Sequence, residues 1–312
     1  MKNNVVIDEY LNATKLGMPY TGRANSEKTL STYGESLRRV ERAIGKPLLQ
    51  CGPTCGQTFL KNSQQLSQST RNTSIVAAKG FFAWAIGNGY FKGANPFEHI
   101  RTKDVEKKLP VVLTHEEALR LLDCIEEAQR QKKDAALEKT NVANFAWTSI
   151  DWAEKYGLFF RVMYFAGLRI DEVLHLRKKD VLEEGIQVQG KGAKERFVPV
   201  QATLLAQLHQ YIDTHPHTDY VFYGEGRTTY ENRPMTVAAA RRAFNEGVKL
   251  AGLPDTITPH KLRHSFATHV LESTKRIEIV QKLLGHENPA TTLIYAKVRP
   301  TELISEYGKA FK

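Results

Sequence analysis

Most of this chain has apolar residues at helical spacing, and only one short region has the alternation expected of β strands. Apolar residues recur every three or four positions from Leu30 to Ile44, which predicts an amphipathic helix. The segments GIQVQG and RFVPV (185–200) alternate instead, with the turn GKGAKE between them, which predicts a β-hairpin. The sequence therefore predicts a mainly α fold with a small β-sheet, of the α+β class.

A polar, basic segment that ends in a proline, IRTKDVEKKLP (100–110), separates two helical regions. Its composition is typical of a linker between domains. We therefore expect one helical domain over residues 1–105 and a second domain over residues 106–312. Directly after the linker, THEE (114–117) has the pattern of a capping box that begins a helix.

Helical patterns return along the second domain, with one ambiguous stretch among them. The polar stretch 129–150 fits either an extension of the preceding helix or an exposed loop. Further helices are expected at residues 152–165, 202–214, 236–250, 259–272, 276–284 and 288–297.

The charge of the chain favours an anionic partner. The formal net charge is +10 and the pI is near 9.4. Residues 1–105 hold fourteen Lys and Arg against seven Asp and Glu, so +7 of this charge lies in the first domain. Nucleic acid is the commonest anionic partner at this size, although a solvated basic surface has the same composition. The candidate contacts to nucleic acid are Arg38, Arg39, Arg42, Lys103, Lys107, Lys108, Arg241 and Arg242.

Hydropathy and cysteine content narrow the class of protein further. No run of eighteen apolar residues occurs, and the start MKNNVVIDEY lacks the features of a signal peptide, so a cytoplasmic protein without membrane contact is expected. Cys51, Cys55 and Cys124 are too few for a disulfide framework. No second ligand pair accompanies Cys51 and Cys55, so we expect ordinary core or surface thiols and no metal.

The helix predicted over TPHKLRHSFATHV (258–270) carries an unusual polar stripe. A threonine at the N-cap and a proline at the first helical position begin it. His260, Arg263 and His264 share one face, which suits a satisfied buried network, a metal site or a site for an anion. His269 falls roughly opposite His260, and we interpret His264 and His269 as structural.

Four other positions of the second domain have side chains that catalysis can use. Arg169 in GLRIDEVLHL follows a glycine that ends a helix, and Glu172 lies one turn further on. Lys191 lies at the hairpin tip, His286 lies in LLGHENP, and Tyr295 follows nine residues later. Each alone fits an ordinary role, such as an ion pair, a solvated lysine or a core tyrosine. Their significance depends on the whole set.

Taken in order, GLR, GKG, HKLRH, LLGH and IY resemble the motifs of the tyrosine recombinase family, also called the phage-type integrases, and are most similar to those of Xer-like bacterial members. The resemblance spans the second domain and implies a helical core-binding domain followed by a tyrosine recombinase catalytic domain. Carried over position by position, the resemblance implies the catalytic set Arg169, Lys191, His260, Arg263, His286 and Tyr295. It also implies that Glu172 supports these residues without being one of them.

These residue types suit attack on a phosphodiester without a metal or cofactor. Two guanidiniums can grip both non-bridging oxygens through forked, charge-assisted hydrogen bonds. His260 can accept the proton of the Tyr295 phenol, whose ordinary pKa is about 10, and Lys191 can protonate the departing 5′ oxygen. His286 can donate a hydrogen bond to the phosphate. The product is a 3′-phosphotyrosine, which a hydroxyl from another strand can attack in turn.

The resemblance implies a site-specific recombinase for integration, excision or dimer resolution, acting on double-stranded DNA as a homotetramer on paired sites, alone or with a second recombinase. Little precedes the helical region, which favours core sites without distant arm sites. The carboxyl-terminal apolar stripe of residues 303–311 is expected to pack on its own domain or on a neighbouring subunit.

Three other functions compete with recombination. A type IB topoisomerase shares the tyrosine chemistry but acts as a monomer, and partner exchange between two sites distinguishes the two. A DNA-binding protein that kept the fold and lost catalysis is disfavoured because every expected catalytic position is filled. A metal-dependent nuclease is disfavoured because no clustered carboxylates accompany the histidines.

Overall fold

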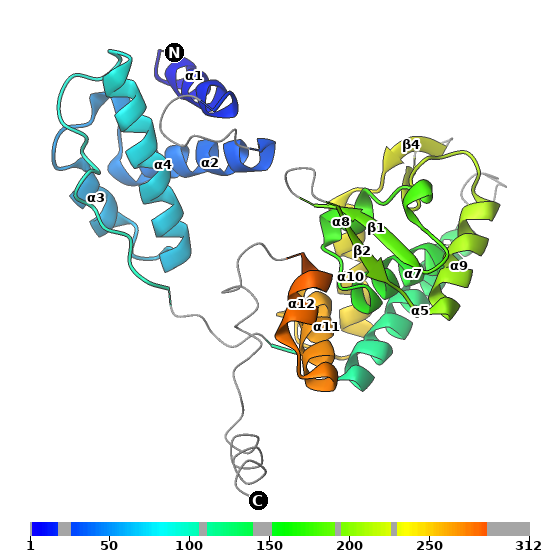
Figure 1. The fold of residues 1–312 in the computed structure, drawn as a ribbon. Coiled ribbons are helices and arrows are strands. Elements are labelled where there is room, and N and C mark those ends of the chain that lie inside the picture. The colour runs from blue at the N-terminus through cyan, green and yellow to red at the C-terminus, as the bar shows by residue number, and fades with distance from the viewer. Residues whose placement is uncertain are drawn as a thin grey trace, which may run out of the picture. The chain divides into compact units, whose positions relative to one another are not determined.

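The computed structural model describes residues 2–17, 26–105, 111–139, 152–190, 195–225 and 230–285. The chain divides into two compact units, residues 1–108 and 109–312. The described residues are mainly helical, with two small antiparallel two-stranded sheets, as Figure 1 shows. This arrangement confirms the predicted fold class.

The first unit is a small helical bundle. Its elements are α1 (Lys2–Lys15), α2 (Glu27–Ile44), the short 3₁₀ helix η1 (Leu48–Gln50), α3 (Cys55–Asn62) and α4 (Gln68–Gly87). Helix α2 begins at the Ser26 N-cap, whose hydroxyl accepts a hydrogen bond from the Thr29 amide, and ends at Gly45 in the left-handed conformation. Phe59, Phe81 and Phe82 are fully buried in the core of the first unit.

The second unit has seven helices of the α type among its described residues, two short sheets and a 3₁₀ turn. The helices are α5 (His115–Lys139), α7 (Trp152–Phe165), α8 (Ile170–Leu174), α9 (Ala202–Thr214), α10 (Val237–Leu250), α11 (Pro259–Thr274) and α12 (Ile277–Leu284), with η2 at Lys178–Asp180. The strands are β1 (Gly185–Gln189) paired with β2 (Glu195–Pro199), and β3 (Tyr223–Glu225) paired with β4 (Tyr230–Pro234).

Local sequence signals explain where several of these elements begin. The predicted capping box opens α5: the Thr114 amide donates to Glu117 Oε2 at 2.8 Å, and the Glu117 amide donates to Thr114 Oγ1 at 3.1 Å. The helix continues to Lys139, so the first part of the ambiguous polar stretch is a helix extension, and residues 140–151 lie outside the described residues. The predicted hairpin forms with Ile186 opposite Val198.

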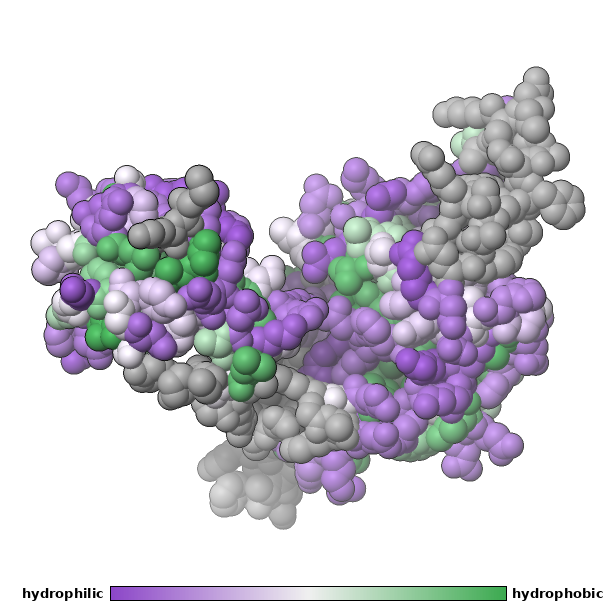
Figure 2. Space-filling model, turned by 90° about the horizontal axis from the view of Figure 1, so that it is seen from above, coloured by the Kyte–Doolittle hydropathy of each residue, from purple (hydrophilic) through white to green (hydrophobic). Residues whose placement is uncertain are grey.

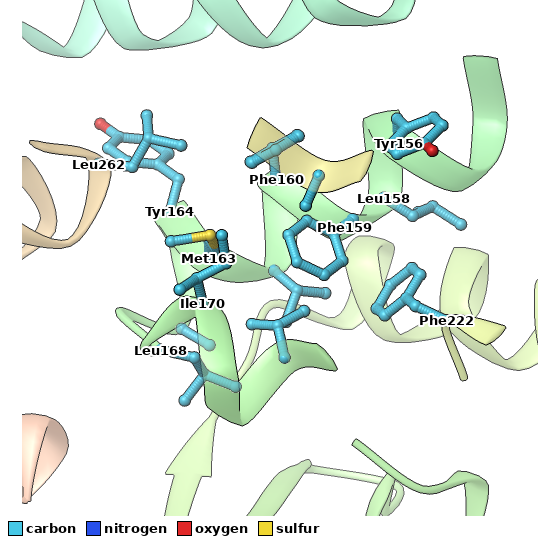
Figure 3. Close-up of a cluster of buried hydrophobic side chains, with 14 of the residues drawn as sticks. Tyr156, Leu158, Phe159, Phe160, Met163, Tyr164, Leu168, Ile170, Phe222 and Leu262 are labelled. Carbon is cyan, nitrogen blue, oxygen red and sulfur yellow. The ribbon is translucent and has the colours of Figure 1, made fainter. Parts of the chain in front are cut away.

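Helix α7 lies at the centre of the second unit and packs against α5, α9 and α11. Its apolar side chains meet residues from other elements, such as Ile170, Leu262 and Phe222 (Figure 3). Phe159 packs edge-on against Phe222, with ring centroids 5.2 Å apart. Each fully buried apolar side chain of this kind contributes roughly 1.5–3 kcal/mol. The core therefore fixes α7 and the turn that follows it.

The surface of the described residues contrasts with this core. In the view of Figure 2, hydrophilic side chains cover most of the visible face. Among the described helices, none is both long and apolar enough to cross a membrane.

Candidate active site

A tight turn after α7 places Arg169. Gly167 has a φ of +60°, and a Cβ there would lie 2.2 Å from Phe266 Cδ1 of α11, so only glycine fits between the two segments. Arg169 then adopts an extended conformation as the N-cap of α8. Its amide donates to Glu172 Oε2 at 2.7 Å and its Nη1 donates to Glu172 Oε1 at 2.8 Å. The predicted ion pair one turn apart is therefore present.

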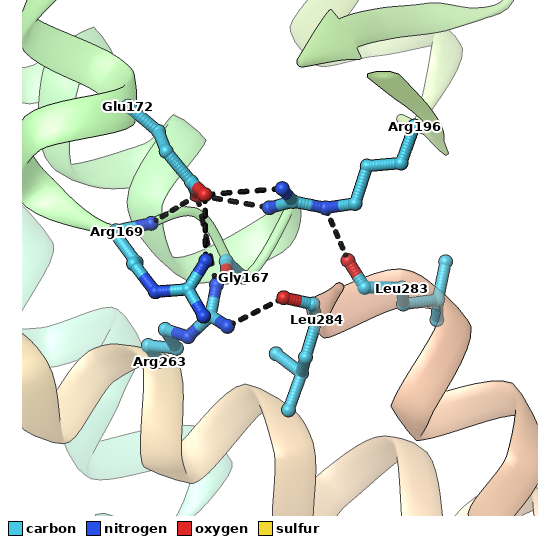
Figure 4. Close-up of polar contacts among 7 residues, drawn as sticks. All are labelled: Gly167, Arg169, Glu172, Arg196, Arg263, Leu283 and Leu284. Carbon is cyan, nitrogen blue, oxygen red and sulfur yellow. Dashed lines mark hydrogen bonds and ion pairs between the residues drawn. The ribbon is translucent and has the colours of Figure 1, made fainter. Parts of the chain in front are cut away.

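Arg263 reaches the same carboxylate from α11. Its side chain is 7% exposed and its Nη1 lies 3.7 Å from Glu172 Oε2. The same Nη1 donates to the Gly167 carbonyl at 2.5 Å, and Nη2 donates to the Leu284 carbonyl at 2.7 Å. The two arginines expected from the motifs thus both reach one carboxylate (Figure 4). Arg169 is the more accessible of the two, with 41% of its side chain exposed.

A third guanidinium, which the sequence analysis did not single out, completes the cluster. Arg196 of β2 donates from Nη1 and Nη2 to the two Glu172 oxygens, at 3.0 and 2.8 Å. One feature of the sequence indicates a role for Arg196. The alternation along β2 puts it on the same face of the strand as the buried Val198. A charged side chain that points toward the core needs a partner.

The electrostatics of this cluster favour an anion. Burial raises the pKa of the Glu172 carboxyl, but the hydrogen bonds from Arg196 and from the Arg169 amide, with the charges of Arg196 and Arg263, bring it below its usual value. Glu172 is therefore ionised at neutral pH. One negative charge among three guanidiniums leaves an excess of positive charge around an exposed Arg169.

The histidines of α11 differ in their surroundings. His260 is exposed in the first turn of the helix, one turn before Arg263. His264 is half-buried, and burial, followed by the charges of Lys261, His260 and Arg263, lowers its pKa from 6.5 to about 4. His264 is therefore neutral at neutral pH and cannot supply charge to an anion.

His269 belongs to a separate network on the other side of α11. Its Nδ1 lies 2.9 Å from the Tyr164 hydroxyl, which lies 2.7 Å from His115 Nδ1. Burial lowers the pKa of His269. The structural interpretation of this histidine is confirmed by these hydrogen bonds.

Changing His264 to Gln should make the protein less sensitive to acid. Because the folded-state pKa is below the unfolded value of 6.5, the unfolded chain binds the proton first as pH falls. His264 therefore lowers the free energy of unfolding progressively between pH 6.5 and about 4, and has no such effect above that window. Urea denaturation of both proteins at several pH values measures the difference. An identical loss of stability in the two proteins over that window would contradict the expectation.

Three catalytic candidates lie outside the described residues: Lys191, His286 and Tyr295. The described chain flanks two of them. Strands β1 and β2 border residues 191–194, which include Lys191, and Gly285, with a φ of +62°, follows the last residue of α12 directly before His286. The carboxyl-terminal apolar stripe and the helix expected at 288–297 also lie outside the described residues.

The basic residues expected to contact DNA are mostly accessible. Arg38, Arg42, Lys103, Arg241 and Arg242 are exposed, and Arg39 is half-buried. Two of them have carboxylate partners, because Arg39 and Arg42 lie 3.8 and 2.8 Å from Glu35. Lys107 and Lys108 lie outside the described residues.

The cysteines are thiols of the protein interior or its margin. Cys51 and Cys55 are buried in the core of the first unit and Cys124 is half-buried. Within the described parts of the chain, no three His, Cys, Asp or Glu residues gather as they would around a metal ion.

Comparison with known proteins places both units in one family. Residues 111–302 match the family described as "Phage integrase family", and residues 21–89 match "Phage integrase, N-terminal SAM-like domain". The tyrosine recombinase XerA of Thermococcus onnurineus is 31% identical over 314 residues, covering 98% of this chain and 95% of the relative.

Two solved structures have the same fold. The XerH site-specific recombinase in a post-cleavage complex with a palindromic difH substrate has a TM-score of 0.69 and 19% identity, covering 99% of this chain and 96% of that chain. A lambda integrase tetramer bound to a Holliday junction has a TM-score of 0.64 and 17% identity, covering 92% of this chain and 77% of that chain. The resemblance drawn from the motifs is confirmed: the chain belongs to the phage integrase family and is a tyrosine recombinase, an enzyme that breaks and rejoins DNA.

Proposed function

We propose that this recombinase cuts and rejoins DNA at specific sites through a 3′-phosphotyrosine on Tyr295. The observation that carries the proposal is the arginine cluster around Glu172, in which Arg169 and Arg263 converge from α8 and α11. Two guanidiniums held in fixed directions, with an excess of positive charge, suit the two non-bridging oxygens of a phosphodiester.

The proposed cleavage step balances without a metal. The Tyr295 oxygen forms a bond to phosphorus, and the bond from phosphorus to the 5′ oxygen breaks. The phenol proton passes to His260, which is exposed in the first turn of α11. Lys191 gives a proton to the departing 5′ oxygen, and His286 donates a hydrogen bond to a non-bridging oxygen.

Recombination follows from the reverse of this step. The phosphotyrosine keeps the energy of the phosphodiester, so a 5′ hydroxyl can attack it without ATP. Attack by the hydroxyl of the same strand restores the original DNA. Attack by the hydroxyl of a partner strand exchanges strands between two sites.

The proposed assembly is a homotetramer on two paired DNA sites, alone or with a second recombinase. The DNA-bound XerH complex and the lambda integrase tetramer on a Holliday junction support this arrangement by their likeness. In it, residues 1–105 bind the core site and residues 106–312 catalyse. The exposed Arg38, Arg42 and Lys103 of the first unit contact phosphates, which position a protein without reading sequence.

The remaining basic candidates have corresponding roles in the proposed complex. Arg39 contacts DNA from the same helix as Arg38, the linker lysines Lys107 and Lys108 follow the backbone, and Arg241 and Arg242 contact DNA from α10. A cellular DNA substrate makes the cytoplasm the expected place of action.

Covalent capture tests the proposed function. The full-length protein is incubated with fragmented host DNA, the reaction is stopped with detergent, and the DNA that remains attached to protein is sequenced. We expect attachment at a few recurring loci, with the adduct mapped by mass spectrometry to the peptide that contains Tyr295. Attachment at many unrelated loci would favour a topoisomerase, and no attachment despite DNA binding would remove the proposed activity.

Changing Lys191 to Ala should slow cleavage by about 10²- to 10⁴-fold, the usual contribution of a general acid. A substrate with a 5′-thiol leaving group should recover much of this loss, because a thiolate departs with little need of a proton. Single-turnover cleavage of both substrates by both proteins measures the effect. An equal loss on the two substrates would remove Lys191 as the acid.

A further inference from the structure

Arg196 donates from every nitrogen of its guanidinium in the cluster around Glu172. Beyond its fork to both carboxylate oxygens, its Nε donates to the Leu283 carbonyl at 3.0 Å. Only 12% of the side chain is exposed. A guanidinium that donates from all three nitrogens to one carboxylate and one backbone carbonyl is held in one orientation.

These contacts join three elements that lie far apart in the sequence (Figure 4). The backbone of Arg196 belongs to β2, which begins directly after residues 191–194, the segment that includes Lys191. Glu172, on α8, holds both the amide and the guanidinium of Arg169. Leu283 lies in the last turn of α12, the helix that leads to residue 286. Arg196 therefore connects the hairpin, the phosphate-binding arginine and the end of α12.

The end of α12 depends on this arginine and on Arg263. The last carbonyls of a helix have no partner within the helix and favour cations. Arg196 satisfies the carbonyl of Leu283, and Arg263 satisfies that of Leu284. The aliphatic stem of Arg196 also packs closely against Gly285, because a Cβ at that position would lie 2.9 Å from Arg196 Cδ. A residue with a side chain would therefore be crowded there.

We propose that Arg196 is a positioning residue, which sets the hairpin and its Lys191 against the phosphate site and does not itself touch DNA. The inference rests on the proposed function. Both terminal nitrogens of Arg196 are engaged by the Glu172 carboxylate, whereas Arg169 donates to that carboxylate through one side-chain nitrogen and is 41% exposed. In this assignment, Arg196 holds Glu172, which supports Arg169, in register with β2, and Arg169 and Arg263 keep the proposed phosphate contacts.

Arg196→Gln is the test variant, because it removes the fork while Glu172 and strand β2 keep their other partners. Glu172 keeps Arg169 at 2.8 Å and Arg263 at 3.7 Å. Strand β2 keeps its pairing with β1 and the buried Val198. Cleavage of an ordinary DNA site should fall about 10²-fold, the scale of a misplacement near 1 Å. A site with a 5′-thiol leaving group should lose less than about 5-fold, since it needs little help from the acid.

Two further variants separate positioning from general damage. Arg161→Gln is the matched control: Arg161 is 24% exposed and lies 3.0 Å from Asp123 and 3.1 Å from Glu126, away from Glu172. The Arg161→Gln variant should cleave both substrates at the wild-type rate. Arg196→Lys keeps the charge without the fork and should recover only part of the ordinary cleavage.

The outcomes distinguish this inference from the proposed function. Arg196→Gln cleaving the ordinary site at the wild-type rate, or losing both substrates equally, would overturn the positioning role alone. A wild-type protein that forms no adduct on its own site would overturn the proposed function and this inference with it. Retained cleavage of the thiol site also shows that the variant is folded, so a selective loss on the ordinary site supports the positioning role.

Discussion

Tyr295→Phe should bind DNA as the wild type does and form no covalent adduct. The substitution removes one hydroxyl and keeps the ring, so the basic residues proposed to contact phosphates are unchanged. Loss of the proposed attacking oxygen should reduce cleavage on the order of 10⁶-fold, the scale seen when a covalent enzyme loses its nucleophile. Gel shift measures the binding, and denaturing electrophoresis of the reaction with labelled DNA measures the adduct.

Tyr307→Phe is the matched control for this result. Tyr307 is a second tyrosine of the carboxyl-terminal region, and the same loss of a hydroxyl there should leave the adduct intact. An adduct that persists in Tyr295→Phe and disappears in Tyr307→Phe would move the nucleophile to Tyr307. An adduct that persists in both variants would place the attacking group elsewhere in the chain.

The elements with strong local signals were predictable from the sequence. Helix α7 spans Trp152–Phe165, the predicted range, because an apolar run ends at a glycine that must adopt a positive φ. Strands β1 and β2 pair as predicted because alternation and a glycine-containing turn act within one short segment. Pro259 begins α11 as predicted, although the Thr258 side chain makes no capping hydrogen bond.

Elements without such signals could not be predicted. Strand β3 has three residues, and the ladder with β4 shifts register between Tyr223 and Gly224. Three residues are too few to show alternation, so tertiary packing decides their conformation. The sheet of β3 and β4 was therefore absent from the sequence-based prediction.

The contacts of the candidate site also differ in how far the sequence predicts them. Arg169 and Glu172 lie one helical turn apart, so their pairing follows from local geometry. Arg196 reaches the same carboxylate from a hairpin, and its partner depends on how β2 packs beside α8 and α12. A sequence pattern indicates that such a residue points inward, but the partner is a property of the folded chain.

Arg169→Gln and Arg263→Gln should both abolish most cleavage but differ in stability. Each removes one of the two guanidiniums proposed to grip the phosphate, and loss of one preorganised donor costs about 10²- to 10³-fold. Single-turnover cleavage of a captured site measures both variants. Tyr295-dependent adduct formation should fall in parallel, because the loss occurs in the chemical step.

The stability difference follows from burial. Arg169 is 41% exposed, and exposed ion pairs contribute about 0–1 kcal/mol. Arg263 is 7% exposed and holds the carbonyls of Gly167 and Leu284, and hydrogen bonds to charged groups contribute about 1.5–3 kcal/mol each. Arg263→Gln should therefore lower the free energy of unfolding by at least about 2 kcal/mol, and Arg169→Gln by less than about 1 kcal/mol.

Denaturant unfolding of the two variants beside the wild type tests this division. Equal stability losses would mean that Arg263 does not hold the turn after α7 and the end of α12 together. A large loss of stability with unchanged cleavage would mean that Arg263 is only structural. In the expected combination, one arginine binds phosphate and also joins α7, α11 and α12, so assembly of the phosphate site would depend on the folding of the second unit.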